Sequence, residues 1–235
     1  MQIDRKQLVQ CEYNFAILIG IDEYPLINAS LHTPVKDATA LHDALLEHQG
    51  YAEEEVLLMT NPTRAELGIF FDRLLLLQGQ VPDEESEGAL SEYRRRALSK
   101  AQLKSEKGEL NFPEAETAAQ KEKYARWEAF LLHLAHFREK RTNEQRDSLL
   151  FYYAGHGLAG EVGEKGPAGY FLPRDTRNHA NRLANNETLL PMEQVFTALH
   201  AFTSHHTLLI LDCCFAGTFS RINTTRATTL GFRPM

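Results

Sequence analysis

The side chains best suited to chemistry in this sequence are one histidine and a pair of adjacent cysteines. His156 stands between Gly155 and Gly157 directly after an apolar run, and Cys213 and Cys214 follow a second apolar run. A cysteine acts as a nucleophile when a neighbouring base, usually a histidine, helps to form its thiolate. The glycines would leave the imidazole unshielded and the Gly157 N–H free to face a developing oxyanion. These residues predict a cysteine–histidine dyad, provided that the fold brings the two stretches together.

The elements that must position them follow an alternating order. Short apolar runs alternate with amphipathic patterns, which predicts an α/β domain with a mostly parallel sheet. In such sheets the functional residues gather outside the carboxyl ends of the strands, where both motifs fall. Strands are expected at 15–21, 55–60, 148–157, 169–173 and 206–214, and helices at 34–50, 63–78 and 191–199.

Two segments interrupt this order. The stretch 80–123 is rich in Glu, Lys, Arg, Gln and Ala, which predicts an insertion of exposed helix and loop. An apolar face at helical spacing resumes over 127–137, so we expect one domain over 1–235 that carries a charged helical insertion at about 80–145. The glycine-rich stretch 157–169 predicts a loop.

Composition excludes several classes of protein. The net charge of −7 gives a nucleic-acid partner no electrostatic support. No run approaches the ~18 apolar residues of a membrane span, and the first residues lack the apolar core of a secretory signal. Three cysteines make no disulfide framework, so we expect a reducing, cytoplasmic setting.

A zinc site is a further possibility that the spacing excludes. His205 and His206 precede Cys213 and Cys214 on one expected strand. Seven residues at ~3.3 Å each place the two pairs roughly 23 Å apart, too far for one metal ion.

Several motifs together resemble the caspase-type cysteine peptidases of clan CD, particularly their metacaspase-like and prokaryotic branch. "YAGHG" and "DCCFAG" are similar to that branch's Tyr-Ser-Gly-His-Gly and Asp-x-Cys-x-x-Gly. "LIGIDEYP", "LHTPVKDATAL" and "GYFLPRDT" match further motifs in the same order. The resemblance covers about 14–79 and 146–220 and implies a mostly parallel sheet between helices, in three layers (α/β/α).

The resemblance also implies roles for particular residues. His156 falls on the catalytic histidine, and Cys214 falls on the nucleophile because it is third in the "DCCFAG" motif. Cys213 occupies the variable position, and alternation along a strand turns the two thiols to opposite sides. The Gly157 and Cys214 backbone N–H groups would hold the oxyanion.

The resemblance further implies a substrate pocket for arginine or lysine. Asp212 and Asp37 match acidic residues of that pocket, although Asp212 could simply cap a strand end and Asp37 could serve the helix dipole. Ala154 stands where many members have Ser, which removes one hydroxyl from the pocket floor. Pro34 and Phe215 also depart from the pattern, where members often have Cys and His.

These inferences lead to an expected function. We expect a cytoplasmic endopeptidase that cleaves proteins after basic residues, needs no cofactor and contacts neither nucleic acid nor membrane. The calcium-binding acidic cluster of some metacaspases has no match here. A catalytically inactive caspase-like scaffold or partner-binding module is the alternative.

The position of the nucleophile bears on partners and regulation. The chain ends 21 residues after Cys214, and the family fold adds two strands there, so we expect a large-subunit region that lacks these last strands. A small-subunit or sensor segment would then be a partner. Self-cleavage is expected in basic stretches, at Arg94, Arg95, Arg96, Lys100, Arg221, Arg226 or Arg233.

Overall fold

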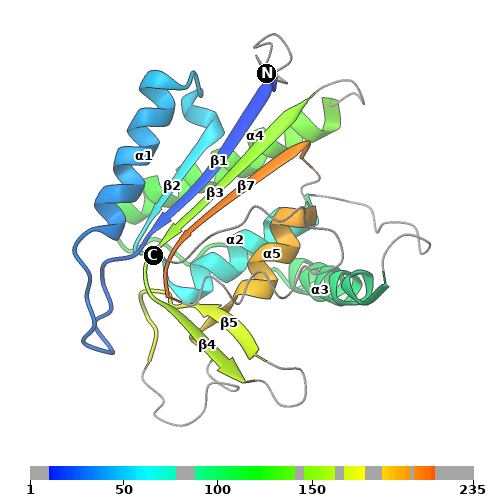
Figure 1. The fold of residues 1–235 in the computed structure, drawn as a ribbon. Helices are drawn as coiled ribbons and strands as arrows, with labels where there is room; N and C mark the ends of the chain where they lie inside the picture. The colour runs from blue at the N-terminus through cyan, green and yellow to red at the C-terminus, as the bar shows by residue number, and fades with distance from the viewer. Residues whose placement is uncertain are drawn as a thin grey trace, which may run out of the picture.

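The main sheet of the computed structural model is parallel. The structure describes residues 11–77, 88–140, 146–161, 167–177, 187–201 and 204–214. Within these residues the sheet has four strands in the order β2–β1–β3–β7 (Figure 1). They are β1 Tyr13–Gly20, β2 Val56–Thr60, β3 Asp147–Ala154 and β7 His206–Asp212. The expected α/β fold with a mostly parallel sheet is confirmed.

The two central strands, β1 and β3, are almost wholly buried because both faces of the sheet are covered. Their sequences, YNFAILIG and DSLLFYYA, are near-continuous apolar runs, as is usual in parallel sheets. Alternate residues serve opposite faces: Phe15 and Ile17 belong to a large core cluster, whereas Ala16 and Leu18 belong to a smaller one.

Helices form the two outer layers. α1 Pro34–His48 packs on the face of the smaller cluster and contacts β1, β2 and β3. The opposite face carries α2 Arg64–Leu76, α4 Ala118–Lys140 and α5 Met192–Ala201, whose apolar residues belong to the large cluster. Figure 1 shows α1 beside β2, with α2 and α5 beyond the other side of the sheet. The three-layer arrangement inferred from the resemblance is therefore present.

In the described part of the charged stretch most side chains are exposed, as the composition predicts, but a few of them pack into the core. α3 Gly88–Glu106 packs against α2 and α5, and its Leu98 and Ala101 are buried. Lys104 of α3 is paired with the nearly buried Asp72 of α2. Leu98 and Ala101 anchor this helix to the core. They could not be recognised from the sequence because charged residues dominate the composition of the segment.

A small antiparallel sheet follows β3. Its strands are β4 Gly157–Glu161, β5 Pro167–Phe171 and β6 Leu190–Pro191, in the order β4–β5–β6. The loop expected at 157–169 is thus wrong at its start, because cross-strand pairing with β5 overrides the low strand propensity of glycine.

No helix of the described residues is both long enough and apolar enough to cross a membrane. The strands that would follow the nucleophile, and the basic positions from Arg221 onward, lie outside the described residues.

Candidate active site

The carboxyl ends of three neighbouring strands come together at one edge of the main sheet. Gly20 of β1, Ala154 of β3 and Asp212 of β7 are paired in one row. The Gly155 N–H donates to the Asp212 carbonyl oxygen at 3.2 Å, which carries the pairing one residue further. His156 and the two cysteines therefore leave the sheet from adjacent strands.

Gly157 is the point where the two motifs touch. A Cβ atom at this position would clash with the Cys214 carbonyl oxygen and lie 3.2 Å from Cys213 Sγ. A backbone oxygen cannot move aside as a flexible side chain can, so residue 157 must be glycine. This close approach places His156 next to the cysteine pair.

The imidazole of His156 is held through one of its two nitrogens. Nε2 lies 2.7 Å from the carbonyl oxygen of Ala29, which can only accept a hydrogen bond, so Nε2 carries a proton. In the neutral ring Nδ1 is then unprotonated and able to accept a proton. The ring of Tyr24 lies against the imidazole with 4.7 Å between ring centroids.

The peptide groups of His156 are held by two buried tyrosines. The His156 N–H donates to the Tyr24 hydroxyl at 2.8 Å, and the Tyr153 hydroxyl donates to the His156 carbonyl oxygen at 2.9 Å. Gly155, between them, has a φ of +155°, and a Cβ there would lie 2.7 Å from the Tyr24 hydroxyl. Sequence reasoning missed Tyr24, Tyr153 and Ala29, although the motif "LIGIDEYP" contains Tyr24.

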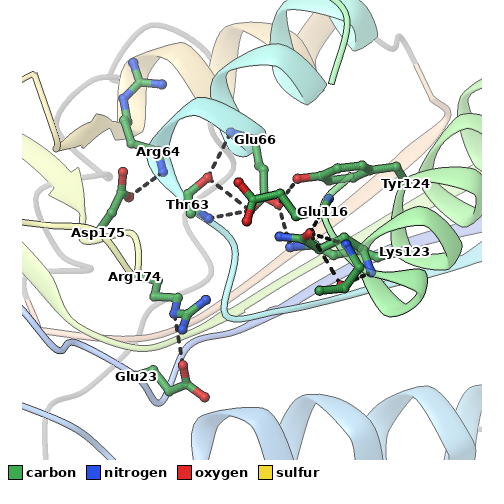
Figure 2. Close-up of polar contacts among 11 residues, drawn as sticks. Glu23, Thr63, Arg64, Glu66, Glu116, Lys123, Tyr124, Arg174 and Asp175 are labelled. Carbon is green, nitrogen blue, oxygen red and sulfur yellow. Dashed lines mark hydrogen bonds and ion pairs between the residues drawn. The ribbon is translucent and has the colours of Figure 1, made fainter. Parts of the chain in front are cut away.

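The loop between β1 and α1, which supplies Tyr24 and Ala29, is tied down at several points. The Asn61 side chain accepts the N–H groups of Asp22 at 2.8 Å and Glu23 at 3.0 Å. Asp22 in turn accepts the Val35 N–H at 3.0 Å, in the first turn of α1. Arg174, beyond β5, forms a 2.9 Å ion pair with Glu23, which Figure 2 shows.

The two cysteines lie in different environments. Cys213 packs against the large core cluster, and burial, with the charges of Cys214 and Asp212, raises the pKa of its thiol to about 12. Cys214 is exposed in the turn that follows β7. At neutral pH Cys213 is therefore a protonated thiol, whereas Cys214 is open to a substrate.

The expected pocket residues lie toward the α1 side of the sheet. Asp212 and Asp37 are exposed, Asp37 lies in the first turn of α1, and Ala154 is fully buried beside Asp212. The pKa of Tyr152 is raised, first by burial and then by the negative charges of Asp212 and Asp37. Both aspartates therefore contribute negative charge to the surroundings of Tyr152.

The Gly157 N–H is not used by the small sheet. The Leu172 N–H donates to the His156 carbonyl oxygen at 3.1 Å, which is one of the two bonds of a hydrogen-bonded antiparallel pair, while the His156 N–H donates to Tyr24. The next pair, Gly157 and Phe171, is then of the non-hydrogen-bonded type. The position of Gly157 beside Cys214 makes its N–H a candidate oxyanion donor.

Over the ranges that the structure describes, no group of three or more His, Cys, Asp or Glu side chains is arranged to hold a metal ion.

A mostly parallel sheet with a histidine and two cysteines at adjacent strand ends makes this an α/β protein with a candidate cysteine–histidine site. The comparison with protein families agrees, because the model described as Caspase domain matches residues 13–230. The chain therefore belongs to the caspase-domain family of cysteine peptidases. No curated protein matches it.

Proposed function

We propose that this chain is a cysteine endopeptidase in which His156 and Cys214 form the catalytic dyad. The contact of Gly157 with the Cys213–Cys214 segment is the observation that carries this proposal, because it puts the two motifs side by side. The protonated Nε2 of His156 adds to it, since it leaves Nδ1 as the base.

The chemistry that these residues support is acyl transfer. Cys214 Sγ gives its proton to His156 Nδ1 and attacks the peptide carbonyl carbon, and the carbonyl electron pair moves to oxygen. The Gly157 and Cys214 N–H groups stabilise that oxyanion. As the C–N bond breaks, His156 protonates the leaving amine, and a thioester remains on Cys214. Water, deprotonated by His156, then attacks the thioester, releases the acid and restores the thiol.

Two exposed carboxylates support a preference for arginine or lysine before the scissile bond. A guanidinium bound beside Asp212 and Asp37 would gain charge-assisted hydrogen bonds, whereas a substrate aspartate would bring a third carboxylate to the same place. This acidic pocket favours the metacaspase-like branch over the aspartate-specific caspases.

An inactive caspase-like scaffold is the second candidate, and the intact His156–Cys214 pair argues against it. Labelling with an arginyl or lysyl chloromethylketone, followed by mapping of the modified residue by mass spectrometry, separates the two. We expect one label on Cys214 that is lost in His156→Ala and retained in Cys213→Ala. Equal labelling of the wild type and His156→Ala would instead indicate an ordinary exposed thiol without a dyad.

A further inference from the structure

The candidate dyad depends on the orientation of one peptide segment, residues 155–157, that belongs to no strand at its centre. His156 itself lies between β3 and β4, so the sheet ladders alone do not orient it. Its backbone N–H donates to the Tyr24 hydroxyl at 2.8 Å, and its C=O accepts from the Tyr153 hydroxyl at 2.9 Å as well as from the Leu172 N–H at 3.1 Å.

Both tyrosines are rigidly placed. Each has an exposed fraction of 0%, and the Tyr153 ring packs against Phe171 with 4.2 Å between ring centroids. The Tyr24 ring also packs against the imidazole at a tilt of 53°, so one residue contacts both the backbone and the ring of His156. Burial raises the pKa of Tyr24 to about 12 and that of Tyr153 well above its usual value of 10. Both phenols therefore stay neutral at physiological pH and are suited to hold His156 rather than to exchange protons with it.

The geometry of Gly155 is matched to this arrangement. Its φ of +155°, and the 2.7 Å that would separate a Cβ atom there from the Tyr24 hydroxyl, leave room only for glycine. The loop that carries Tyr24 is held by the Asn61 side chain, which accepts the Glu23 N–H. The Arg174–Glu23 ion pair adds a second contact to this loop (Figure 2).

We propose that Tyr24 and Tyr153 are positioning residues, whose hydroxyls hold the His156 peptide from both sides so that Nδ1 faces Cys214. This inference rests on the proposed dyad and goes beyond it, because it assigns the orientation of the base to two residues outside the dyad, which bond the His156 peptide. Loss of either hydroxyl leaves the ring packing in place and loosens the imidazole.

The test measures the reactivity of Cys214 separately from peptide hydrolysis. The rate of alkylation of Cys214 by iodoacetamide is followed by mass spectrometry across pH, in full-length wild type, Tyr24→Phe, Tyr153→Phe and His156→Ala. Where a histidine promotes the thiolate, the wild type reacts well below the usual thiol pKa of about 8.5, and His156→Ala does not. We expect each Tyr→Phe variant to lower the rate near neutral pH by about tenfold, and to lower kcat similarly with KM unchanged.

The matched control is Tyr124→Phe. It removes a tyrosine hydroxyl bond of the same 2.8 Å length, to Glu66, in the α2–α4 contact rather than at His156. We expect it to leave the alkylation profile unchanged. An equal loss in Tyr124→Phe would show general loosening and overturn the inference.

The remaining outcomes separate the inference from the proposed function. Identical profiles for the wild type and His156→Ala overturn the dyad, and the inference with it. If His156→Ala lowers the alkylation rate but both Tyr→Phe variants keep the wild-type profile, the proposed dyad stands and only the role of the tyrosines is overturned. Hydrogen exchange in the wild type needs no variant to fold: we expect a protected His156 amide, and exchange at the rate of an exposed amide would overturn the role of Tyr24.

Discussion

At the scale of single residues, burial distinguishes two thiols that are neighbours in sequence. Alternation sends Cys213 toward the core and leaves Cys214 exposed at the strand end. Because burial raises the pKa of Cys213 to about 12, its thiolate is negligible at neutral pH. Of the two thiols only that of Cys214 is exposed, and the backbone carbonyl of Cys214 lies against Gly157, next to His156.

The first prediction concerns this pair. Cys214→Ala should lower the rate of hydrolysis of an arginyl peptide by about four orders of magnitude or more, since the nucleophile is lost. Cys213→Ala should keep much of the activity and show a modest loss of stability from its core contact. Release of a fluorogenic leaving group measures the first effect and thermal unfolding the second. The reverse pattern of activities would make Cys213 the nucleophile.

The second prediction concerns Asp212 and specificity. Asp212→Asn keeps the shape of the side chain but removes the charge, and charged hydrogen bonds contribute ~1.5–3 kcal/mol. We expect kcat/KM for arginyl peptides to fall by about 10- to 100-fold, while alkylation of Cys214 by iodoacetamide changes little. Wild-type turnover of aspartyl peptides at the rate of arginyl peptides would refute the acidic pocket.

At the scale of elements, the buried carboxylate of Glu66 joins helix α2 to helix α4. Glu66 of α2 accepts hydrogen bonds from Lys123 at 2.7 Å, Tyr124 at 2.8 Å and the Thr63 N–H at 2.7 Å (Figure 2). Burial alone would raise the pKa of Glu66, but the bonds from Lys123 and Thr63 outweigh it, and the pKa lies below its usual 4.5. The same carboxylate caps α2 and fixes α4 against it.

The third prediction is the effect of removing that charge. Glu66→Gln should reduce the free energy of unfolding by about 3 kcal/mol, because Lys123 then loses its charged partner in a buried contact. Folding lowers the pKa of Glu66 below 4.5. The difference in the free energy of unfolding between wild type and Glu66→Gln is therefore full above pH 4.5, and it declines as the pH falls through the lowered pKa of the folded state. Urea unfolding of both proteins across pH measures it.

Glu122→Gln is the control for this experiment. It breaks an exposed ion pair with Arg126 of the same 2.7 Å length, and such pairs contribute at most about 1 kcal/mol. An equal effect from the two variants would show that the buried network has no special role in stability.

At the scale of the whole molecule, the described part of the charged stretch between α2 and β3 packs on helices that cover the main sheet. Helices α3 and α4 pack on α2, which in turn packs on α5. Arg95, Arg96 and Lys100 lie in α3, whose Leu98 and Ala101 are buried, so a protease could reach their peptide bonds only after local unfolding. The structure therefore makes these three positions poor sites for self-cleavage.

The fourth prediction follows for self-cleavage. Concentrated wild type should cut itself after Arg221, Arg226 or Arg233, and not after Arg95, Arg96 or Lys100. Sequencing of the new termini identifies the cuts, and Cys214→Ala incubated in parallel should stay intact. The same fragments from both proteins would reveal a contaminating protease.

The sequence by itself determined the main strands and the elements that end in chemistry. β1 and β3 are apolar runs that only a doubly covered parallel sheet can bury, and His156 and Cys214 follow strands in the order that the family motifs predict. These strands and motifs could be predicted from the sequence because each depends on residues close together in the chain. The resemblance to caspase-type peptidases came from the same local motifs.

Only the tertiary structure decided how the site is held together. Tyr24 reaches His156 across 132 positions of sequence, Ala29 reaches it across 127, and Gly157 meets Cys214 only because β3 and β7 are neighbours. The anchoring of α3 through Leu98 and Ala101 and the strand at Gly157–Glu161 likewise depend on partners distant in sequence, which outweigh local composition. Periodicity and propensity report on neighbours along the chain, whereas the orientation of a catalytic base depends on contacts that folding alone creates.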